Sequence, residues 1–436
     1  MIWLSLILTF VFTSGIYYLI GFFSIRKVKN YGSIWIKLQR SIKHKKLKKM
    51  CFIILVLTLS SSILLISYNI SNRIAFFRLN ISGNSQWVSS YGQKYLYIEA
   101  DNNYDLGYHT GYQLSSEIIK MKFLIYLYAP ILGLPYSDFE SLCLDYLSYI
   151  PEIYKQEIQG ISDGATAGGG FYISFRDVLV QSVFFEVVYG RINPLKQSIN
   201  EALGCTAFGS KNGDGSVIIG QNMDLLKPFS WIQSFVLHKL EGKPMVFTYR
   251  LGGCPALPMG KNEYGLTLIT NLVQTNVEAP VMEPTFVVVR EGLANSKNIE
   301  DFYKILVYNN KSAYSRNLMV ANSTSILSIQ ALPENHTIQI PTTTMVQSNT
   351  YINSYWQKYL IDLNYSKNRQ VFAESLLSIA YNDNELTNSE LLSMLKSQPI
   401  ICRDESGLFG TQTVAFMTFN SFGLGNPNGR IGIIPI

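Results

Sequence analysis

Two long uncharged apolar runs near the start of the chain constrain its fold more than any other feature. They cover residues 1–24 and 51–72, and each is long enough to cross the hydrocarbon core of a bilayer as a helix. The segment 26–49 between them carries ten Lys/Arg residues, and no Asp or Glu occurs before Glu99. By the positive-inside rule such a basic loop stays in the cytoplasm. We therefore expect residues 1–73 to form a two-span transmembrane hairpin in contact with membrane lipids.

This hairpin would place everything after residue 73 outside the cytoplasm, either on an outer cell face or in a lumen. A cleaved signal peptide is the alternative for the first run, but that run lacks the charged segment that normally precedes the apolar core of a signal peptide. The expected localisation is thus the membrane, with an extracytoplasmic catalytic domain.

The charge balance excludes several classes of protein. The chain has 36 Lys/Arg, and without the ten of the basic loop 26 remain against 30 Asp/Glu. The surplus of positive charge therefore belongs to one short segment, so nucleic acid is not an expected partner. With 47% apolar and 15% charged residues among 436, the chain is also unlike a disordered protein and long enough for a sizeable core.

Residue patterning divides the remainder into three parts. Residues 74–94 are polar and rich in turn formers, which predicts a connector. Residues 95–204 contain one strand candidate followed by segments of helical periodicity, and 205–436 begin with strands and then alternate between helices and strands. Helices followed by antiparallel hairpins indicate a layered α+β domain with stacked sheets. The glycine-rich run 164–171 is interpreted as a helix end and a turn, because no strand leads into it and no GK[ST] follows.

Cysteines are few and widely spaced, at positions 51, 143, 205, 254 and 402. No CxxC, HExxH or Cys/His cluster occurs, so no metal site is expected. In an oxidising compartment a disulfide could form among Cys143, Cys254 and Cys402, although the spacing selects no pair.

A cysteine hydrolase with a histidine base is one candidate chemistry, but the histidines are poorly placed for it. His44 is in the predicted cytoplasmic loop, and His336 is in a turn-like segment. His109 precedes the candidate nucleophile, and His238 is in a predicted strand beside a lysine.

A second candidate chemistry uses no histidine. In an N-terminal-nucleophile hydrolase, self-cleavage frees the α-amine of the nucleophile, and this amine acts as the base because its ordinary pKa is about 7.7–8.0. The pair Gly204-Cys205 opens a predicted strand, and a KNGDG turn leads to a return strand that contains Gln221 and ends at Asp224. Pairing Ser210 with residue 216 would place Cys205 opposite Gln221 and bring Asp224 next to the new amino terminus. A buried cysteine on a structural hairpin is the alternative.

The segments LGCTAF (203–208) and DGSVIIGQNMD (214–224) closely resemble the acyl-coenzyme A:6-aminopenicillanic acid acyltransferase family, the C45 group of self-processing acyltransferases and hydrolases. The resemblance extends to Gly107 and Gly111 in an early glycine motif, to EIQGISDGATAGG (157–169) and to MGKNEYGLTLITNL (259–272). It covers about residues 95–436. It implies the αββα sandwich of the N-terminal-nucleophile hydrolases, no cofactor, and α and β pieces that stay associated after cleavage.

Carried over by position, the resemblance makes Cys205 the nucleophile and the first residue of a β piece covering 205–436. Asp224 would orient the freed amine, Asn349 would lend its amide to the oxyanion hole, and Asn271 would support it. Gly204 and Cys205 would flank the cleaved bond. As alternatives, Asn349 could be a plain turn residue and Asn271 a strand-end cap.

The sequence departs from the family at two places. Related hydrolases have an arginine just before the last strands, near Gln412 here, and the nearby Arg403 cannot be aligned with it. The segment NTYINS (349–354) replaces a histidine-rich stretch of the relatives. Both departures concern the substrate more than the reaction.

The sequence thus predicts a membrane-tethered, self-processing cysteine amidohydrolase or acyltransferase that acts on a small linear amide or a lipid-like acyl thioester. Hydrolysis is favoured over transfer, since acyl-coenzyme A is hard to supply outside the cytoplasm. A non-catalytic membrane-anchored binding protein on the same scaffold is the alternative, and a transporter fragment does not fit a chain with so long a region after its two spans.

Overall fold

The computed structural model describes residues 81–435 apart from 91–92, 197–203, 307–311, 342, 362–363, 403–408, 419–420 and 426–430. The predicted hairpin at 1–73 lies outside the described residues. In the part that is described, no single helix has the length and apolar composition of a membrane span. Two consecutive segments, Ser115–Ile131 and Tyr136–Tyr149, meet these criteria only together, and a bend of 109° separates them.

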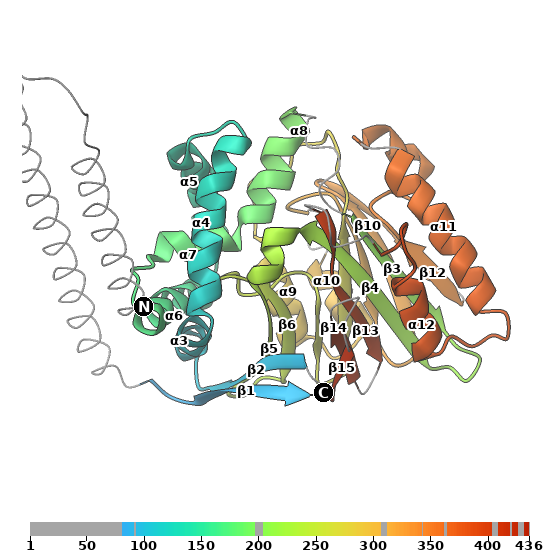
Figure 1. Cartoon of the computed structure of the whole chain (residues 1–436), viewed down its shortest axis with the longest axis horizontal. Helices are drawn as coiled ribbons and strands as arrows, with labels where there is room; N and C mark the ends of the chain where they lie inside the picture. Colours follow the sequence, from blue (N-terminus) through green and yellow to red (C-terminus); the bar gives the residue numbers. More distant parts are fainter. Residues whose placement is uncertain are drawn as a thin grey trace, which may run out of the picture. The chain divides into compact units, whose positions relative to one another are not determined.

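Two β-sheets build the described domain (Figure 1). In the larger sheet the strand order is β1-β2-β5-β6-β7-β8-β9-β10-β11, and its pairs are antiparallel except for the parallel pair β2–β5. Its strands are β1 (Asn84–Ser90), β2 (Gln93–Ala100), β5 (Gln233–Leu240), β6 (Val246–Leu251), β7 (Gly260–Asn262), β8 (Thr267–Leu272), β9 (Arg316–Ala321), β10 (Ile326–Leu332) and β11 (Asn335–Gln339).

The smaller sheet is antiparallel throughout, with the order β12-β3-β4-β13-β14-β15. Its strands are β3 (Gly204–Lys211), β4 (Val217–Leu226), β12 (Thr344–Gln347), β13 (Phe409–Thr418), β14 (Ser421–Gly425) and β15 (Ile431–Pro435). Strand β3 contacts β8 and β10, so one face of this sheet packs on the larger sheet. The opposite face is covered by α11 (Asn364–Ala380) and α12 (Asn388–Leu395).

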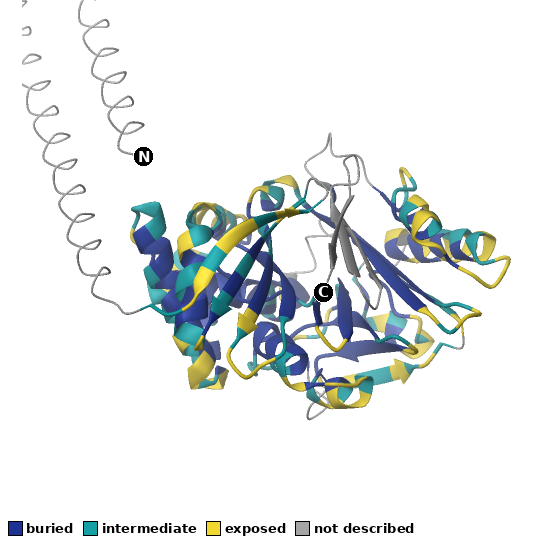
Figure 2. Cartoon of the chain, turned by 90° about the horizontal axis from the view of Figure 1, so that it is seen from below, coloured by how far each residue is buried: buried dark blue, intermediate teal, exposed yellow. Residues whose placement is uncertain are grey.

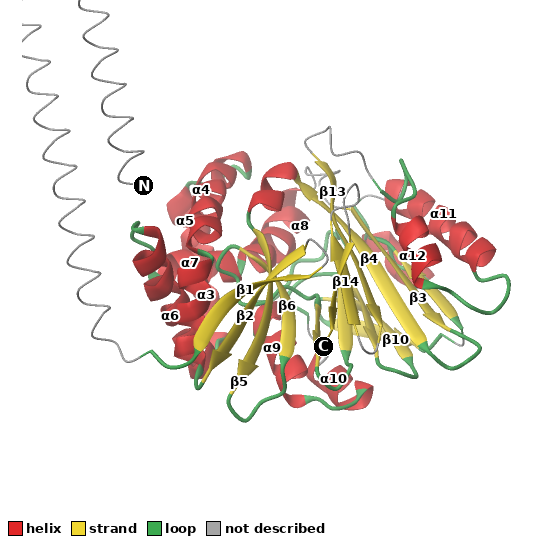
Figure 3. Cartoon of the chain, turned by 60° about the horizontal axis from the view of Figure 1, so that its bottom comes forward, coloured by secondary structure: helices red, strands yellow, loops and turns green. Residues whose placement is uncertain are grey.

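Helices also cover the outer face of the larger sheet, and they give the domain its layered arrangement (Figure 3). The helices before the first hairpin are α3 (Asn103–Gln113), α4 (Ser115–Ile131), α5 (Tyr136–Leu144), α6 (Glu152–Gly169), α7 (Phe175–Ser182) and α8 (Asn193–Lys196). The 3₁₀-helix η1 (Asp145–Tyr149) follows α5 and the π-helix η2 (Glu186–Ile192) precedes α8, and α9 (Thr285–Asn295) and α10 (Ile299–Leu306) come later in the chain. The layers are helix, sheet, sheet, helix, and the strands between them are mostly buried (Figure 2).

Glycines allow α3 and α6 to pack with their backbones in contact. A Cβ added at Gly107 would lie 2.1 Å from the Glu157 carbonyl oxygen, and one at Gly164 would lie 2.0 Å from the Tyr108 carbonyl oxygen. Side chains therefore do not fit at these positions, which explains why glycines recur four residues apart on both helices.

The glycine-rich run ends a helix as predicted, but the end comes late in the run. Most of it continues α6 up to Gly169, and the helix ends only at Gly170, whose φ of 62° is the left-handed cap that glycine favours. The low helix propensity of glycine predicts a break earlier in the run. Packing of Gly164 against α3 overrides that propensity.

Two other segments differ from what their sequences predict. The β-branched residues 285–289 (TFVVV) have the composition of a strand, but they begin α9. Pro284 precedes the first turn, and the carboxylate of the buried Glu186 accepts a hydrogen bond of 2.8 Å from the Thr285 N–H, so this helix start is capped from another element. In the expected connector 74–94, residues Asn84–Ser90 form strand β1, paired with β2.

Candidate active site

The hairpin β3–β4 brings Cys205 and Asp224 together. Gly204 pairs with Asp224, and Cys205 pairs with Met223. The prediction that Cys205 lies opposite Gln221 is therefore wrong by two residues. The turn is centred one residue later than expected, because Lys211 still pairs with Val217 and the Asn212 N–H donates to the Ser216 carbonyl at 2.8 Å. This register places the Asp224 carboxylate opposite the Gly204-Cys205 bond.

Asn349 approaches Cys205 from the other side of β3. Strand β12 pairs with β3 so that Gln347 lies opposite Ala207, and two further residues bring Asn349 level with Cys205. The Cys205 N–H donates to Asn349 Oδ1 at 2.6 Å, and Asn349 Nδ2 donates to the Leu272 carbonyl at 2.6 Å. Cys205 and Asn349, 144 residues apart, are thus joined by a buried hydrogen bond.

The Asp224 carboxylate is fully buried and both of its oxygens have partners. Thr411 Oγ1 donates to Oδ1 at 2.6 Å, and Arg369 Nη1 lies 3.3 Å from Oδ2. Arg369 Nη2 also donates to Asn349 Oδ1, so one guanidinium connects the carboxylate to the amide. The arrangement fixes both groups against the bond between Gly204 and Cys205.

Arg369 is the site residue that sequence reasoning missed. The expected late arginine was placed near Gln412, which lies in β13, whereas Arg403 lies outside the described residues. Arg369 instead comes from α11, where it is 1% exposed and stacks 5.2 Å from the ring centroid of Tyr365. Its local sequence, SKNRQ, has the composition of an exposed helical face. The buried acceptors that would indicate its role are distant in the chain.

Asn271 lies one contact away from Asn349, which binds Cys205. Its Nδ2 donates to the Gln347 carbonyl at 2.6 Å, and its Oδ1 accepts from Gln221 Nε2 at 2.6 Å. Gln347 belongs to β12, the strand that leads to Asn349. The structure therefore brings Gly204, Cys205, Asp224 and Asn349 together, and it places Asn271 where it holds the strand of Asn349.

A comparison with protein families decides the relationship. Residues 210–415 match the model of the acyl-coenzyme A:6-aminopenicillanic acid acyl-transferase family. The match covers slightly less than half of the chain, and this part is similar to that family. The resemblance seen in the sequence is thereby confirmed, and the chain is an enzyme of the hydrolase and acyltransferase class that acts on amide bonds.

Comparison with solved structures finds similar chains, three of which have a TM-score of 0.40 each. An N-acylethanolamine-hydrolyzing acid amidase ortholog of Caenorhabditis elegans has 13% sequence identity, and the match covers 49% of this chain and 93% of that one. A mutant of conjugated bile acid hydrolase from Clostridium perfringens has 15% identity over 53% and 92%, and another variant of that hydrolase has 13% over the same shares. A search of curated proteins found no match.

The electrostatics around Cys205 keep its thiol neutral. Burial, followed by the nearby Asp224 carboxylate, raises the pKa of the Cys205 thiol to about 12, and the Arg369 guanidinium opposes this rise. A thiol with such a pKa is protonated at neutral pH, so a proton acceptor is required to generate the thiolate. The site supplies a carboxylate, and cleavage would add an amine.

The three described histidines make their contacts elsewhere. His109 Nε2 donates to the Ser82 carbonyl at 2.9 Å, and His336 Nε2 is 2.8 Å from the Tyr303 hydroxyl. His238 is buried in β5 near Arg250 and Arg290. The described region thus offers no support for a cysteine–histidine pair.

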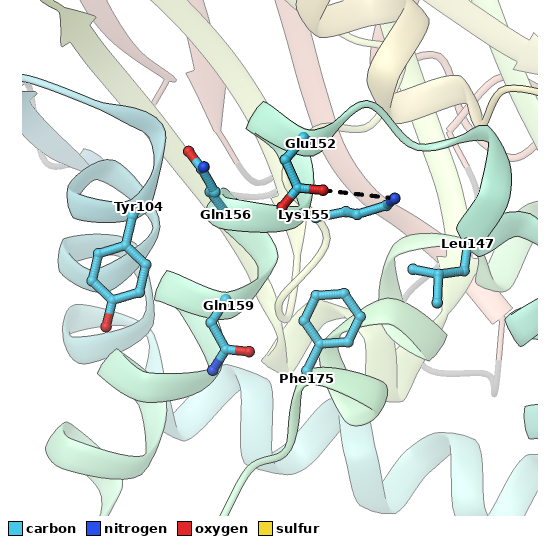
Figure 4. A pocket seen from close by; sticks show the side chains of 7 residues that line it. All are labelled: Tyr104, Leu147, Glu152, Lys155, Gln156, Gln159 and Phe175. Atoms are coloured by element: carbon cyan, nitrogen blue, oxygen red, sulfur yellow. Dashed lines mark ion pairs between the residues drawn. The ribbon is translucent and has the colours of Figure 1, made fainter.

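A small apolar cavity of about 50 Å³ adjoins Cys205. Its lining comes mainly from aliphatic, methionine and aromatic side chains: Phe185, Met223, Leu225, Leu251, Leu257, Pro258, Met259, Thr270, Leu272 and Tyr314. Another hollow, of about 380 Å³, is formed by α3, η1, α6 and α7 and contains the Glu152–Lys155 ion pair at 3.8 Å (Figure 4). None of the predicted site residues lines that second hollow.

The other cysteines do not join the site. Cys143 and Cys254 are buried and free, as is Cys205, and Cys402 is buried as well. Cys254 Sγ donates to the Ala256 carbonyl at 3.3 Å, so the thiol of this buried residue has a hydrogen-bond partner within the fold. Among the described residues, no group of three or more His, Cys, Asp or Glu side chains could hold a metal ion.

Proposed function

We propose that the chain is a self-processing cysteine amidohydrolase or acyltransferase whose mature nucleophile is the N-terminal Cys205. The observation that carries this proposal is the joint placement of Asp224, Arg369 and Asn349 around the Gly204-Cys205 bond. A cysteine with a purely structural role does not require a carboxylate opposite the preceding residue. It also does not require a side-chain amide that binds its own backbone N–H.

The first step would be self-cleavage. The Cys205 thiol gives its proton to Asp224 and attacks the Gly204 carbonyl carbon to form a tetrahedral intermediate. Asp224 then passes this proton to the Cys205 nitrogen as the C–N bond breaks, which leaves a thioester and a free Cys205 α-amine. Water then hydrolyses the thioester and leaves the Gly204 carboxylate and the Cys205 thiol. Gly204 suits this step because a Cβ there would lie 2.2 Å from Arg369 Nη1 and 2.6 Å from Asp224 Oδ2.

Turnover would use the new amine as the general base. An amine with an ordinary pKa of about 7.7–8.0 can accept the thiol proton at neutral pH. Asp224 orients it electrostatically, and Asn349, held by Arg369, offers a side-chain N–H to the oxyanion of the tetrahedral intermediate. An acyl-enzyme on Cys205 follows, which water or an amine acceptor resolves.

The apolar cavity beside Cys205 favours a substrate with an apolar acyl group, because its lining has few hydrogen-bonding groups. A volume of about 50 Å³ admits only a small part of such a group. The substrate class we propose is therefore a small amide or acyl thioester with a lipid-like acyl chain, and cleavage before residue 205 would be needed to enlarge the space.

The two pieces would stay associated after cleavage within an αββα sandwich of the N-terminal-nucleophile type. Strand β2 from the first piece pairs with β5 from the second. Glu157 of α6 forms ion pairs with Arg290 at 3.1 Å and Arg250 at 3.6 Å, all of them buried. Separation of the pieces would expose a sheet edge and leave these charges unpaired.

The membrane tether and the extracytoplasmic location remain part of this proposal, supported by the apolar runs and the basic loop of residues 1–73. Protease treatment of intact cells or sealed vesicles tests them. We expect the region after residue 80 to be digested from the outside. Protection of this region together with cytoplasmic proteins would contradict the assignment.

The reaction is tested with fluorogenic acyl amides of increasing chain length. We expect the wild-type chain to release the amine product, with faster turnover for apolar acyl groups, and to form a mass adduct on Cys205. A processed chain that cleaves none of these amides and forms no adduct would favour the alternative of a binding protein.

A further inference from the structure

Helix α4 exposes an unusually apolar face. Phe123, Leu127 and Ile131 recur every four residues, with Tyr126 beside them, and these four side chains are 50–74% exposed. We refer to these four residues as the α4 apolar face. The inner side of the same helix is buried in the core through Ile118, Met121, Ile125 and Ala129. The outer face is thus apolar without being needed for the packing of the helix.

The uncharged stretch extends beyond the helix. Residues 123–136 contain no charged side chain, and they run through the C-terminal half of α4 and the turn to α5. Tyr126 and Tyr136 lie against each other with ring centroids 4.8 Å apart. Lys120, one turn before Phe123, is exposed. An apolar surface with tyrosines at its border and a lysine at one end matches the boundary between headgroups and acyl chains.

The length of the preceding chain favours lipid as the occupant. The second apolar run ends at residue 72, and the described domain begins nine residues later, at Ile81. Nine residues span at most ~30 Å when fully extended. If the second run crosses the bilayer, the domain therefore stays within that distance of the membrane surface.

We propose that the α4 apolar face lies in the headgroup region of the membrane that anchors the chain, so that the domain rests on the bilayer instead of moving freely on its connector. This inference rests on the proposed tether and is independent of the proposed chemistry. It describes contact with a bilayer surface, since the inner side of α4 is part of the protein core.

The test uses the full-length chain in phosphatidylcholine vesicles with a polarity-sensitive fluorophore on a new cysteine. Leu127→Cys reports on the α4 apolar face, and Ile379→Cys on α11 is the matched control, because the two side chains are 68% and 70% exposed. The unsubstituted chain, treated in the same way, gives the background from Cys51 and from the buried thiols. Vesicles with brominated acyl chains then quench any fluorophore that enters the bilayer.

We expect brominated lipid to reduce the emission at position 127 at least about two-fold and to leave position 379 almost unchanged, because interfacial helices bury their apolar face about 5–10 Å deep. Three results would overturn the proposal. In the first, the label at position 127 is not quenched and its emission shows that it is in water. In the second, it is not quenched but its emission shows an apolar environment, because a second copy or residues 1–80 cover it. In the third, positions 127 and 379 are quenched equally. A chain that fails to float with vesicles after a high-salt wash would instead overturn the tether itself.

Discussion

Two carboxylates in this domain are completely buried and paired with arginine, yet their surroundings differ. Asp224 on β4 has a partner on each oxygen, Thr411 and Arg369. Glu157 on α6 has both of its arginines on the same oxygen, Oε1, and its Oε2 is without a hydrogen-bond partner among the described residues. The first carboxylate is fixed in position, and the second is only neutralised.

The reactive groups near the two carboxylates differ as well. Asp224 faces the Gly204-Cys205 bond and contributes to the raised pKa of the Cys205 thiol. Glu157 on α6 is paired with Arg250 of β6 and Arg290 of α9, and His238 lies near these two arginines. Burial and ion pairing therefore do not by themselves mark a catalytic carboxylate. In the mechanism we propose, the bond to be cleaved and the nucleophile beside Asp224 make the difference, and the following substitutions test this distinction.

The largest effect is expected from a change of the nucleophile. Cys205→Ala should abolish self-cleavage and amide turnover, because no thiol remains at the strand start. Cys254→Ala is the matched control: burial raises the pKa of this thiol to about 12 as well, and it lies in the same core. Gel mobility and amide turnover report both outcomes. Loss of processing in both variants, or in neither, would contradict the role of Cys205.

The two carboxylates are compared by Asp224→Asn and Glu157→Gln. Asp224→Asn leaves one buried arginine without its counter-charge and Glu157→Gln leaves two, so each should lower the free energy of unfolding by about 3–5 kcal/mol or more. Activity per folded molecule separates them: we expect a loss of at least ~100-fold for Asp224→Asn, as for a lost acid–base group, and a change of less than about three-fold for Glu157→Gln. Equal losses per folded molecule would show that Asp224 is structural.

A smaller effect is expected from Gly204→Ala. The added Cβ would meet Arg369 Nη1 and Asp224 Oδ2 and would force them apart. Local strain of about 1–3 kcal/mol corresponds to about 5- to 150-fold slower processing. Gly213→Ala in the hairpin turn is the control, since its Cβ would have no neighbour closer than 3.5 Å. Time-resolved gels measure the rate of processing. If Gly204→Ala is processed at the wild-type rate, the Asp224–Arg369 pair does not matter for cleavage.

The smallest effect concerns pH and the region of Glu157. Burial, with Arg290 and Arg250 nearby, lowers the pKa of His238 well below its usual range. The unfolded chain would therefore take up a proton near pH 6.5 that the folded chain does not, so stability is lost as the pH falls below about 6.5. We expect a slope of at most about 1.4 kcal/mol per pH unit between about pH 6.5 and 5, reduced in His238→Gln. Denaturant unfolding of both chains across this pH range measures the slope. Identical slopes for the wild type and His238→Gln would exclude His238 as the cause.

Features that depend on local sequence could be predicted. The β3–β4 hairpin follows from its turn residues, and the buried strands follow from their apolar runs. The predicted register is wrong by two residues, because the turn residues define a loop but not its centre. That centre depends on Asn212 contacts with Leu386 from a distant segment. Strand-like residues 285–289 are helical because Glu186 caps them from another element.

Features that depend on long-range contacts could not be predicted. Asn349 was found through the family resemblance, and its pairing next to Cys205 follows from β12. Arg369 could not be found, because its sequence neighbours are those of an exposed helix and its partners Asp224 and Asn349 are 145 and 20 residues away. A buried arginine in a helix can be recognised only when its acceptors are known.

Intact-mass analysis of the purified wild-type chain, with N-terminal sequencing, tests the central claim most directly. An internal Cys205 has no free α-amine, so the proposed base exists only after the bond to Gly204 breaks. We predict two associated pieces, one ending at Gly204 and the other starting at Cys205. A single uncleaved chain of 49.3 kDa that still hydrolyses an amide would contradict the proposed mechanism.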